Sequence, residues 1–144
     1  ELLQKYKRDS WIVFTENKKQ AKEFNAIINT KGYQSAIYNT DLDASEREEN
    51  LNNFKSGNLN VLVSCTALDE GFDMPEADGA MILSASSSKR QRIQRMGRVL
   101  RITANKQNAL IVTVYSSKTE YEKLREESNR YQLEGVPIKW QQMK

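Results

Sequence analysis

The residue types best suited to chemistry are concentrated in one basic stretch between positions 88 and 101. Gln94, Arg98 and Arg101 have the spacing i, i+4, i+7, so a continuous helix would carry them on one face. Two guanidinium groups one turn apart can hold a polyphosphate by bidentate hydrogen bonds, and an arginine at a transferring phosphoryl group contributes about 10³–10⁵ in rate. The alternative is a solvated basic helix. Gly97 argues against it, because glycine inside a helix costs about 1 kcal/mol unless close approach requires it.

A second candidate site follows the apolar run that ends at Val63. Thr66 can bind a phosphate through its hydroxyl and backbone N–H if a short helix begins there. Gly71 allows the backbone to approach a ligand or to adopt a positive φ, and Asp73 can accept hydrogen bonds from ribose hydroxyls. Taken alone, this segment is better explained as an ordinary surface turn with a glycine and a proline.

Composition excludes several classes of function. The chain has 144 residues, 38% hydrophobic and 28% charged, which suits one globular domain. Without histidine and with one cysteine it has no Cys/His zinc site, no internal disulfide and no Ser-His-Asp or Cys-His catalysis. The apolar runs are too short to cross a bilayer and no secretory signal is present, so we expect a cytoplasmic, nucleoid or nuclear location without membrane contact. A first residue of Glu1 suggests a segment of a longer protein.

Short apolar runs without polar alternation predict strands buried on both faces. The predicted strands are 11–14, 34–38, 60–64, 79–83 and 109–115, with a late strand at 136–140. Between them we expect α-helices. Their predicted ranges are 2–8, 18–31, 45 to about 56, 87 or 88 to about 98, and 118–131.

Two local signals define the expected helix surfaces and ends. Ala21, Phe24 and Ile28 form one apolar stripe, with Ile27 beside it. Ser45 and Glu48 have the spacing of a capping box, so we expect the third helix to open there and to stop at Gly57. Strands that alternate with helices indicate an α/β fold with a mostly parallel sheet, whose ligands gather at the carboxyl ends of the strands.

An ordered set of motifs resembles the C-terminal domain of superfamily 2 helicases. Ile12-Val13-Phe14-Thr15 looks like motif IV, Ser64 to Pro75 like motif V, and Gln94 to Arg101 like motif VI. The match covers about residues 10 to 115, and its specificity lies in the order of the motifs. Gln-Arg-x-Gly-Arg-Val-Leu-Arg is similar to XPB-like and restriction-type DNA translocases, whereas DEAD-box RNA helicases more often begin this motif with His-Arg.

The resemblance implies a fold: a three-layer RecA-like sandwich with helices on both faces of the sheet. Residues 1–144 would be one helicase C-terminal domain, with 116–144 as a helix and strand extension of it. Arg98 and Arg101 would be the arginine fingers that face the γ-phosphate of ATP. Gln94 would contact the phosphates or the attacking water.

The resemblance also implies partners. Gly71 and Asp73 would meet the ribose, and Thr15, Asn17 and Thr66 would touch nucleic-acid phosphates, of DNA more than of RNA. ATP and Mg²⁺ would be bound mainly by an N-terminal RecA-like lobe of the same polypeptide. This chain has no Gly-x-x-x-x-Gly-Lys-[Ser/Thr] loop and no strand-end Asp-Glu pair, so we expect the isolated chain neither to hydrolyse ATP appreciably nor to unwind a duplex.

Two other functions remain to be weighed. The first is a nucleic-acid or protein binding module with a degenerate ATPase, and the intact Arg98 and Arg101 argue against it. The second is a stand-alone nucleotide-binding protein of metabolism, which is disfavoured because no glycine-rich phosphate loop follows the first strand.

Overall fold

The computed structural model describes residues 2–5, 10–39, 42–65, 77–83, 110–133 and 138–140. The chain divides into two compact units, Glu1–Val114 and Tyr115–Lys144, and each is described by itself. The helix predicted to run from position 87 or 88 to about 98 lies outside the described residues.

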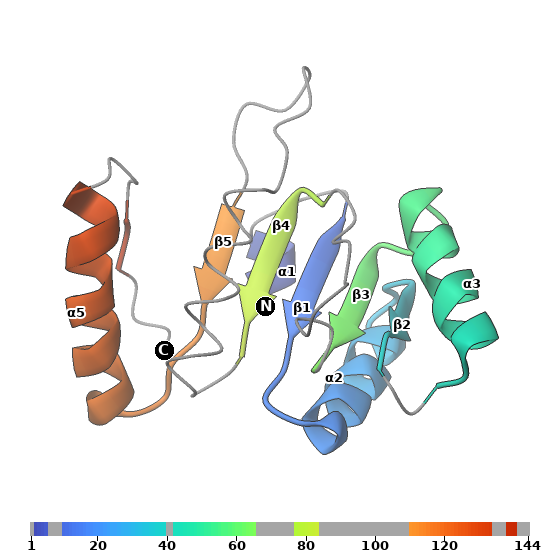
Figure 1. Ribbon diagram of the computed structural model, residues 1–144, viewed down its shortest axis with the longest axis horizontal. Helices are drawn as coiled ribbons and strands as arrows, with labels where there is room; N and C mark the ends of the chain where they lie inside the picture. The colour runs from blue at the N-terminus through green and yellow to red at the C-terminus, as the bar shows by residue number, and fades with distance from the viewer. Residues whose placement is uncertain are drawn as a thin grey trace. The chain divides into compact units, whose positions relative to one another are not determined.

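A five-stranded parallel sheet forms the centre of the first unit (Figure 1). The strands are β1 (Trp11–Phe14), β2 (Ser35–Ile37), β3 (Val61–Ser64), β4 (Gly79–Ile82) and β5 (Leu110–Thr113). Their order across the sheet is β2-β3-β1-β4-β5. All five strands lie within the predicted ranges, and the prediction of a parallel α/β sheet is confirmed. The structure adds the strand order, which no local pattern contains.

The three central strands, β3, β1 and β4, are buried throughout because both faces of the sheet are covered. Alternate side chains point to opposite faces of a strand, so each strand supplies two cores. The core on one face contains Ile12, Phe14, Leu62, Ala80 and Ile82, together with Phe54 of the helix α3 (Ala44–Lys55). The core on the other face contains Trp11, Val13, Val61, Val63 and Met81, together with Ala21 and Ile28 of the helix α2 (Lys18–Thr30) and Leu3 of α1 (Leu2–Lys5).

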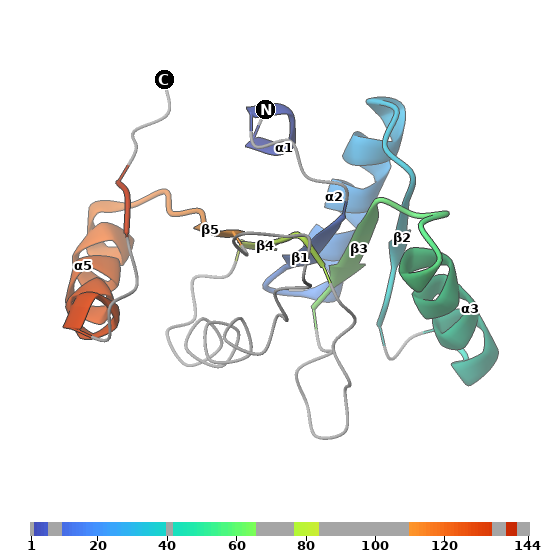
Figure 2. The ribbon, with the colours of Figure 1, turned by 90° about the horizontal axis from the view of Figure 1, so that it is seen from above.

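The helices therefore lie in two layers with the sheet between them. Seen from above, α1 and α2 lie on one side of the sheet and α3 on the other (Figure 2). This three-layer arrangement is the predicted one. The apolar stripe of α2 is narrower than expected, since Ile27 is 54% exposed while Ala21 and Ile28 are buried. Ile27 lies one residue before Ile28 and is therefore turned by about 100° around the helix, which points its side chain toward solvent.

The start of α3 corrects the predicted capping box. The N-cap is Asp43 and not Ser45: Asp43 is extended, and its carboxylate accepts a hydrogen bond from the Glu46 backbone N–H (Oδ1···N 2.8 Å). Aspartate caps a helix as well as serine does, and Glu46 stands three residues after it, as a capping box requires. Asp43 and Ser45 are both suitable N-cap residues. The helix begins after the first of them, so Ser45 lies in its first turn. The helix ends at Lys55, and Gly57 has the positive φ (87°) that its predicted stop implied.

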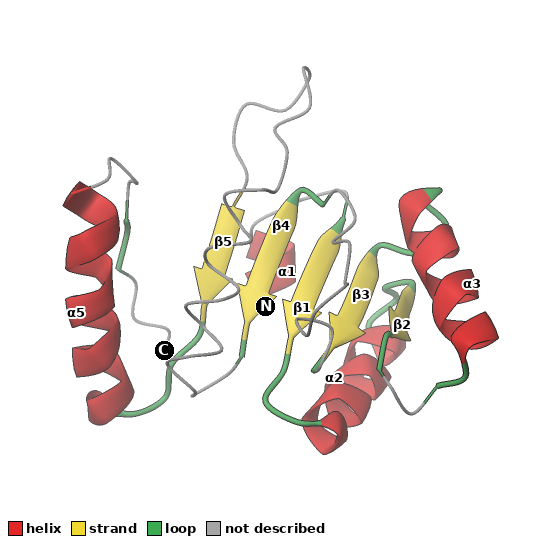
Figure 3. Cartoon of the chain, viewed as in Figure 1, coloured by secondary structure: helices red, strands yellow, loops and turns green. Residues whose placement is uncertain are grey.

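The second unit is built on the helix α5 (Lys118–Leu133), drawn in red in Figure 3. The Glu120 carboxylate accepts from the backbone N–H groups of Ser116 (2.7 Å) and Ser117 (3.2 Å), and Ser117 in turn accepts from the Glu120 N–H (3.1 Å). This reciprocal capping box opens the helix. The late strand predicted at 136–140 is not formed over the described residues 138–140.

Aromatic packing holds the described end of the chain within this unit. The ring of Trp140 makes edge contacts with Tyr115 (centroids 6.2 Å apart) and Tyr121 (5.3 Å), and the Arg125 guanidinium lies 4.5 Å from the Trp140 ring centroid. Such contacts are typical of packing residues. Among the described residues, no helix has the length and apolar character needed to cross a membrane.

Candidate functional site

The carboxyl ends of β1, β2 and β3 meet at one edge of the sheet. All the strand arrows point toward this edge (Figure 3). Thr15 follows β1, Tyr38 and Asn39 follow β2, and Cys65 follows β3. In open parallel sheets ligands bind at this edge, so these are the described positions where a ligand of the first unit is expected.

The loop after β1 is shaped by its own polar groups. Thr15 is fully buried; its backbone N–H donates to the Ser64 carbonyl (2.9 Å) and its hydroxyl to the Asn17 carbonyl (3.1 Å). Asn17 is the N-cap of α2, and its side-chain oxygen accepts from the Gln20 N–H (2.8 Å). The Gln20 side chain accepts from the Glu16 N–H (2.7 Å). The predicted nucleic-acid residues Thr15 and Asn17 thus share one ordered turn, and the Thr15 hydroxyl is used inside it.

Three lysines that the sequence analysis did not single out surround the start of α2. Lys18, Lys19 and Lys22 occupy its first two turns, no acid lies in the first turn, and Lys19 and Lys22 are exposed. The amino end of a helix carries a partial positive charge and favours anions, so cations there are unfavourable without an anionic ligand. Lysines closely following an asparagine, a residue type favoured at the N-cap, are the signal in the sequence that marks this region.

Behind the same edge lies a cluster of buried polar groups. Asn39 is 2% exposed, and its side-chain oxygen accepts hydrogen bonds from the backbone N–H (3.2 Å) and the thiol (3.3 Å) of Cys65. The Ser64 hydroxyl donates to the Tyr38 carbonyl (2.8 Å). Buried polar groups that are satisfied in this way stiffen the backbone around them. Sequence analysis missed Asn39, whose only signal is an amide side chain placed directly after a strand.

The remaining predicted site residues lie outside the part of the chain that the structure describes. They are Thr66, Gly71, Asp73, Gln94, Arg98 and Arg101. Their roles stay predictions. Within the described ranges, no group of three or more acidic, cysteine or histidine residues could hold a metal ion.

Comparison with protein families and known proteins identifies the class. The chain matches the helicase conserved C-terminal domain over residues 1–103. It is 39% identical over 121 residues to the DNA 3'-5' translocase XPB2 of Sulfurisphaera tokodaii, a match that covers 84% of this chain and 26% of that protein. It is 31% identical over 103 residues to the ATP-dependent RNA helicase DBP3 of Candida glabrata, covering 68% of this chain and 19% of that protein. The chain thus spans about a quarter or less of the length of these curated relatives.

Solved structures show the same fold. The C-terminal domain of the DEAD-box protein Dbp5 superposes with a TM-score of 0.75 at 21% identity, over 90% of this chain and 74% of that one. The Hef helicase domain of Pyrococcus furiosus superposes with a TM-score of 0.62 at 25% identity, over 87% of this chain and 26% of that one. The likeness to Dbp5 concerns the fold alone.

The parallel sheet covered by helices on both faces is the RecA-like α/β fold of such helicase C-terminal domains. The chain belongs to the helicase conserved C-terminal domain family. The resemblance stated from the motifs is confirmed.

Proposed function

We propose that this chain is the C-terminal lobe of an ATP-dependent DNA translocase or helicase. In this proposal, Arg98 and Arg101 reach the γ-phosphate of an ATP held by an N-terminal lobe, and Gln94 contacts its phosphates or the attacking water. Gly71 and Asp73 meet the ribose. Magnesium and the phosphate-binding loop belong to the N-terminal lobe, and bound ATP supplies the free energy that closes and opens the two lobes.

The observation that carries the proposal is the shared edge at which two predicted nucleic-acid segments meet. Thr15 is hydrogen-bonded to Ser64, two residues before Thr66, so the motif IV turn and the start of motif V leave the sheet side by side. The lysines at the start of α2 add positive charge beside that turn. Backbone N–H groups and lysines that contact phosphates bind a strand without reading its sequence, as a motor that moves along nucleic acid requires.

DNA is the preferred substrate in this proposal. The support is the 39% identity to the XPB2 DNA translocase and the Gln-Arg start of the predicted motif VI at Gln94. Relatives at lower identity include an RNA helicase, so both nucleic acids belong in the test. ATPase activity of the two-lobed protein should rise more with single-stranded DNA than with RNA of the same sequence and length. Equal or stronger stimulation by RNA would contradict the DNA assignment.

The arginine fingers are tested in the longer polypeptide that carries both lobes. Arg98→Ala with Arg101→Ala should lower the nucleic-acid-stimulated kcat by about 10³-fold or more, since an arginine finger contributes about 10³–10⁵ in rate. Arg90→Ala, a change of the same type in the same basic stretch, serves as the control. A double variant that keeps its ATPase activity and its affinity for DNA would favour a binding module with a degenerate ATPase.

The chain by itself should be catalytically silent. It has no phosphate-binding loop of the Walker type in its sequence, and arginine fingers act only on a nucleotide that another part of the protein positions. Phosphate release by the purified 144-residue chain, with and without DNA, measures this. ATP hydrolysis by the isolated chain at an ordinary enzymatic rate would refute the proposal that hydrolysis requires both lobes.

A further inference from the structure

Among the described strands, β2 lies at one end of the sheet (Figure 3). Its hydrogen bonds to β3 come from alternate residues: the Gln34 carbonyl accepts from the first N–H of β3 (3.1 Å), and the Tyr38 N–H donates to the Val63 carbonyl (2.8 Å). Successive residues of a parallel strand direct their backbone groups to opposite sides. The backbone groups of Ser35 and Ile37 therefore face the open edge, where a further strand could pair with them.

Asparagine side chains from both helix layers occupy this open edge. Asn50 of α3 donates from Nδ2 to the Ile37 carbonyl (2.9 Å). Near the end of α2, the Asn29 side-chain oxygen accepts from the Ser35 N–H (3.4 Å), and the Asn25 side-chain oxygen accepts from the Ser35 hydroxyl (2.6 Å). Because α2 and α3 cover opposite faces of the sheet, these contacts reach the edge from both sides. Amide side chains thus supply hydrogen bonds that an added strand would otherwise supply.

The strand itself has little of what usually protects a sheet edge. Lysine, proline, a bulge or a very short length are the common devices. β2 is short, at three residues, and it pairs with β3 in continuous register without a bulge. Residues 33–38 have the sequence Tyr-Gln-Ser-Ala-Ile-Tyr, which contains no charge, no proline and no glycine. Uncharged segments of this length with aromatic and β-branched side chains are prone to pair between chains. Most of the protection must therefore come from outside the strand.

We propose that Asn29 and Asn50 keep the edge of β2 from pairing with the β2 edge of a second copy of this chain. Their amides hold the Ser35 N–H and the Ile37 carbonyl, so an incoming strand would have to displace them. Asn25 supports the arrangement by holding the Ser35 hydroxyl. A second copy is the competitor because two identical uncharged strands can pair about a twofold axis without charge repulsion. The inference does not depend on which nucleotide or nucleic acid the protein binds.

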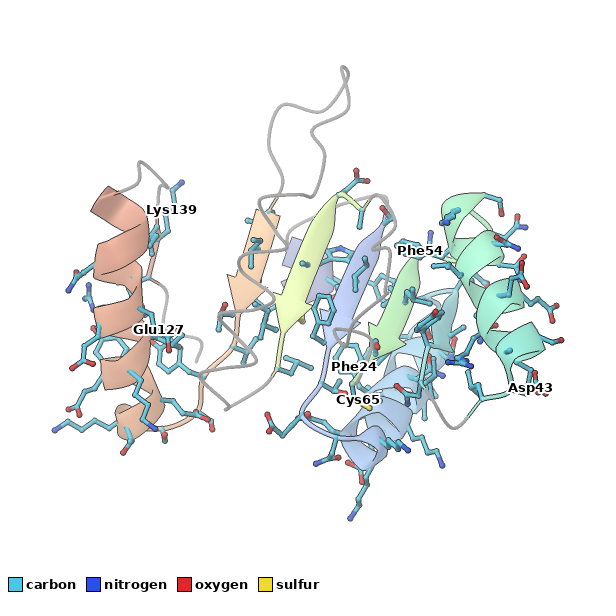
Figure 4. All side chains as sticks on the ribbon, in the orientation of Figure 1. Phe24, Asp43, Phe54, Cys65, Glu127 and Lys139 are labelled. Carbon is cyan, nitrogen blue, oxygen red and sulfur yellow. The ribbon has the colours of Figure 1, made fainter. Side chains whose placement is uncertain are left out.

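The test removes the edge amides from the 144-residue chain and measures self-association. Asn29→Ala combined with Asn50→Leu removes both hydrogen bonds to the β2 backbone. Asn52→Leu is the matched control for added apolar surface, because Asn52 is exposed on the same helix. Asp43→Ala controls for lost stability: Asp43, labelled in Figure 4, caps α3 and makes no contact with the edge amides. Sedimentation velocity over a series of protein concentrations measures association, and circular dichroism shows that each variant is folded.

A further substitution tests whether the association uses the edge. Ser35→Pro, added to the double variant, removes the N–H that the loss of Asn29 sets free, and proline cannot donate to a second strand. The hydrogen bonds of Gln34 and Tyr38 to β3 are left in place. Proline at this position cannot restore the lost amide contacts, so a return to the monomer would report on edge pairing and not on stability.

The double variant should associate about tenfold more tightly or more than the unsubstituted chain, because two backbone groups per chain become available to an incoming strand. Asn52→Leu and Asp43→Ala should stay monomeric over the same concentrations. Adding Ser35→Pro should return the double variant to the monomer. If the double variant does not fold, Asn50→Ser replaces it in every comparison, since serine is too short to reach the Ile37 carbonyl.

Three results would overturn the inference. The first is a folded double variant that is as monomeric as the unsubstituted chain. The second is association that Asn52→Leu or Asp43→Ala matches, or that persists with Ser35→Pro, because added apolar surface or lost stability would then explain it. The third is an unsubstituted chain that already associates and that Ser35→Pro alone makes monomeric, because the amides would then fail to block the edge.

Discussion

Replacing Gly79 with alanine should destabilise the first unit, although alanine usually favours folding over glycine. Gly79 starts β4 and stands in register beside Trp11 of β1. A Cβ atom at position 79 would lie 2.8 Å from two carbons of the Trp11 ring and 3.1 Å from a third. Carbon atoms prefer separations of about 3.5–4.0 Å, so the ring or the strand must move.

The ring has little room to move. Trp11 is 2% exposed and lies in the core formed with α1 and α2, between two neighbouring strands. Overpacking of this kind costs about 1–3 kcal/mol, and the lower chain entropy of unfolded alanine recovers up to about 1 kcal/mol. We expect a net loss of about 1–2 kcal/mol in the free energy of unfolding for Gly79→Ala.

Urea unfolding followed by far-ultraviolet circular dichroism measures the loss by linear extrapolation. The decisive comparison repeats Gly79→Ala in a Trp11→Phe background, where the smaller ring leaves space and the cost should fall by more than half. Gly32→Ala is the control: it has φ +89° and no atom within 4 Å of a built Cβ, so its cost comes from the backbone and should not depend on residue 11. An equal cost of Gly79→Ala in both backgrounds would refute the steric argument.

The two helix caps supply further predictions. Asp43→Ala should lower the free energy of unfolding by about 1 kcal/mol through loss of the α3 N-cap, whereas Ser45→Ala should change it by less than about 0.5 kcal/mol, with urea unfolding as the measurement. The reverse order would restore Ser45 as the cap. Glu120→Ala should open the first turn of α5, because its carboxylate holds the N–H groups that precede the helix, and amide exchange at Ser117 should accelerate severalfold. Glu122→Ala, an exposed change in the same helix, is its control, and equal acceleration in both variants would exclude the cap as the cause.

The strands and the parallel sheet could be predicted from short patterns in the sequence. Runs such as Trp11-Ile12-Val13-Phe14 and Val61-Leu62-Val63 lack polar alternation. This pattern is typical of a strand that is buried on both faces of a sheet. The parallel sheet followed from their alternation with helices. The family followed from the order of the motifs, which is a property of sequence and needs no coordinates.

Other features depend on distances that no local pattern encodes. The sequence contains two adequate caps for α3, at Asp43 and at Ser45, and only the folded helix shows that the first is used. Ile27 looked like a neighbour of the apolar stripe, yet the rotation of α2 against the sheet leaves it in solvent. Gly79 and Trp11 are far apart in the chain, and their contact exists because β1 and β4 are neighbours in the sheet.

The sequence by itself therefore determined the class of fold, the family and which loops should carry function, because these depend on short-range periodicity and on motif order. Tertiary structure decided which of those loops stand together. Placing β1 between β3 and β4 brings Thr15 against Ser64, and placing β2 beside β3 brings Asn39 against Cys65. The apolar strands are similar in sequence and could pair in several orders. The order that forms is the one in which the whole chain packs best, so no single segment encodes it.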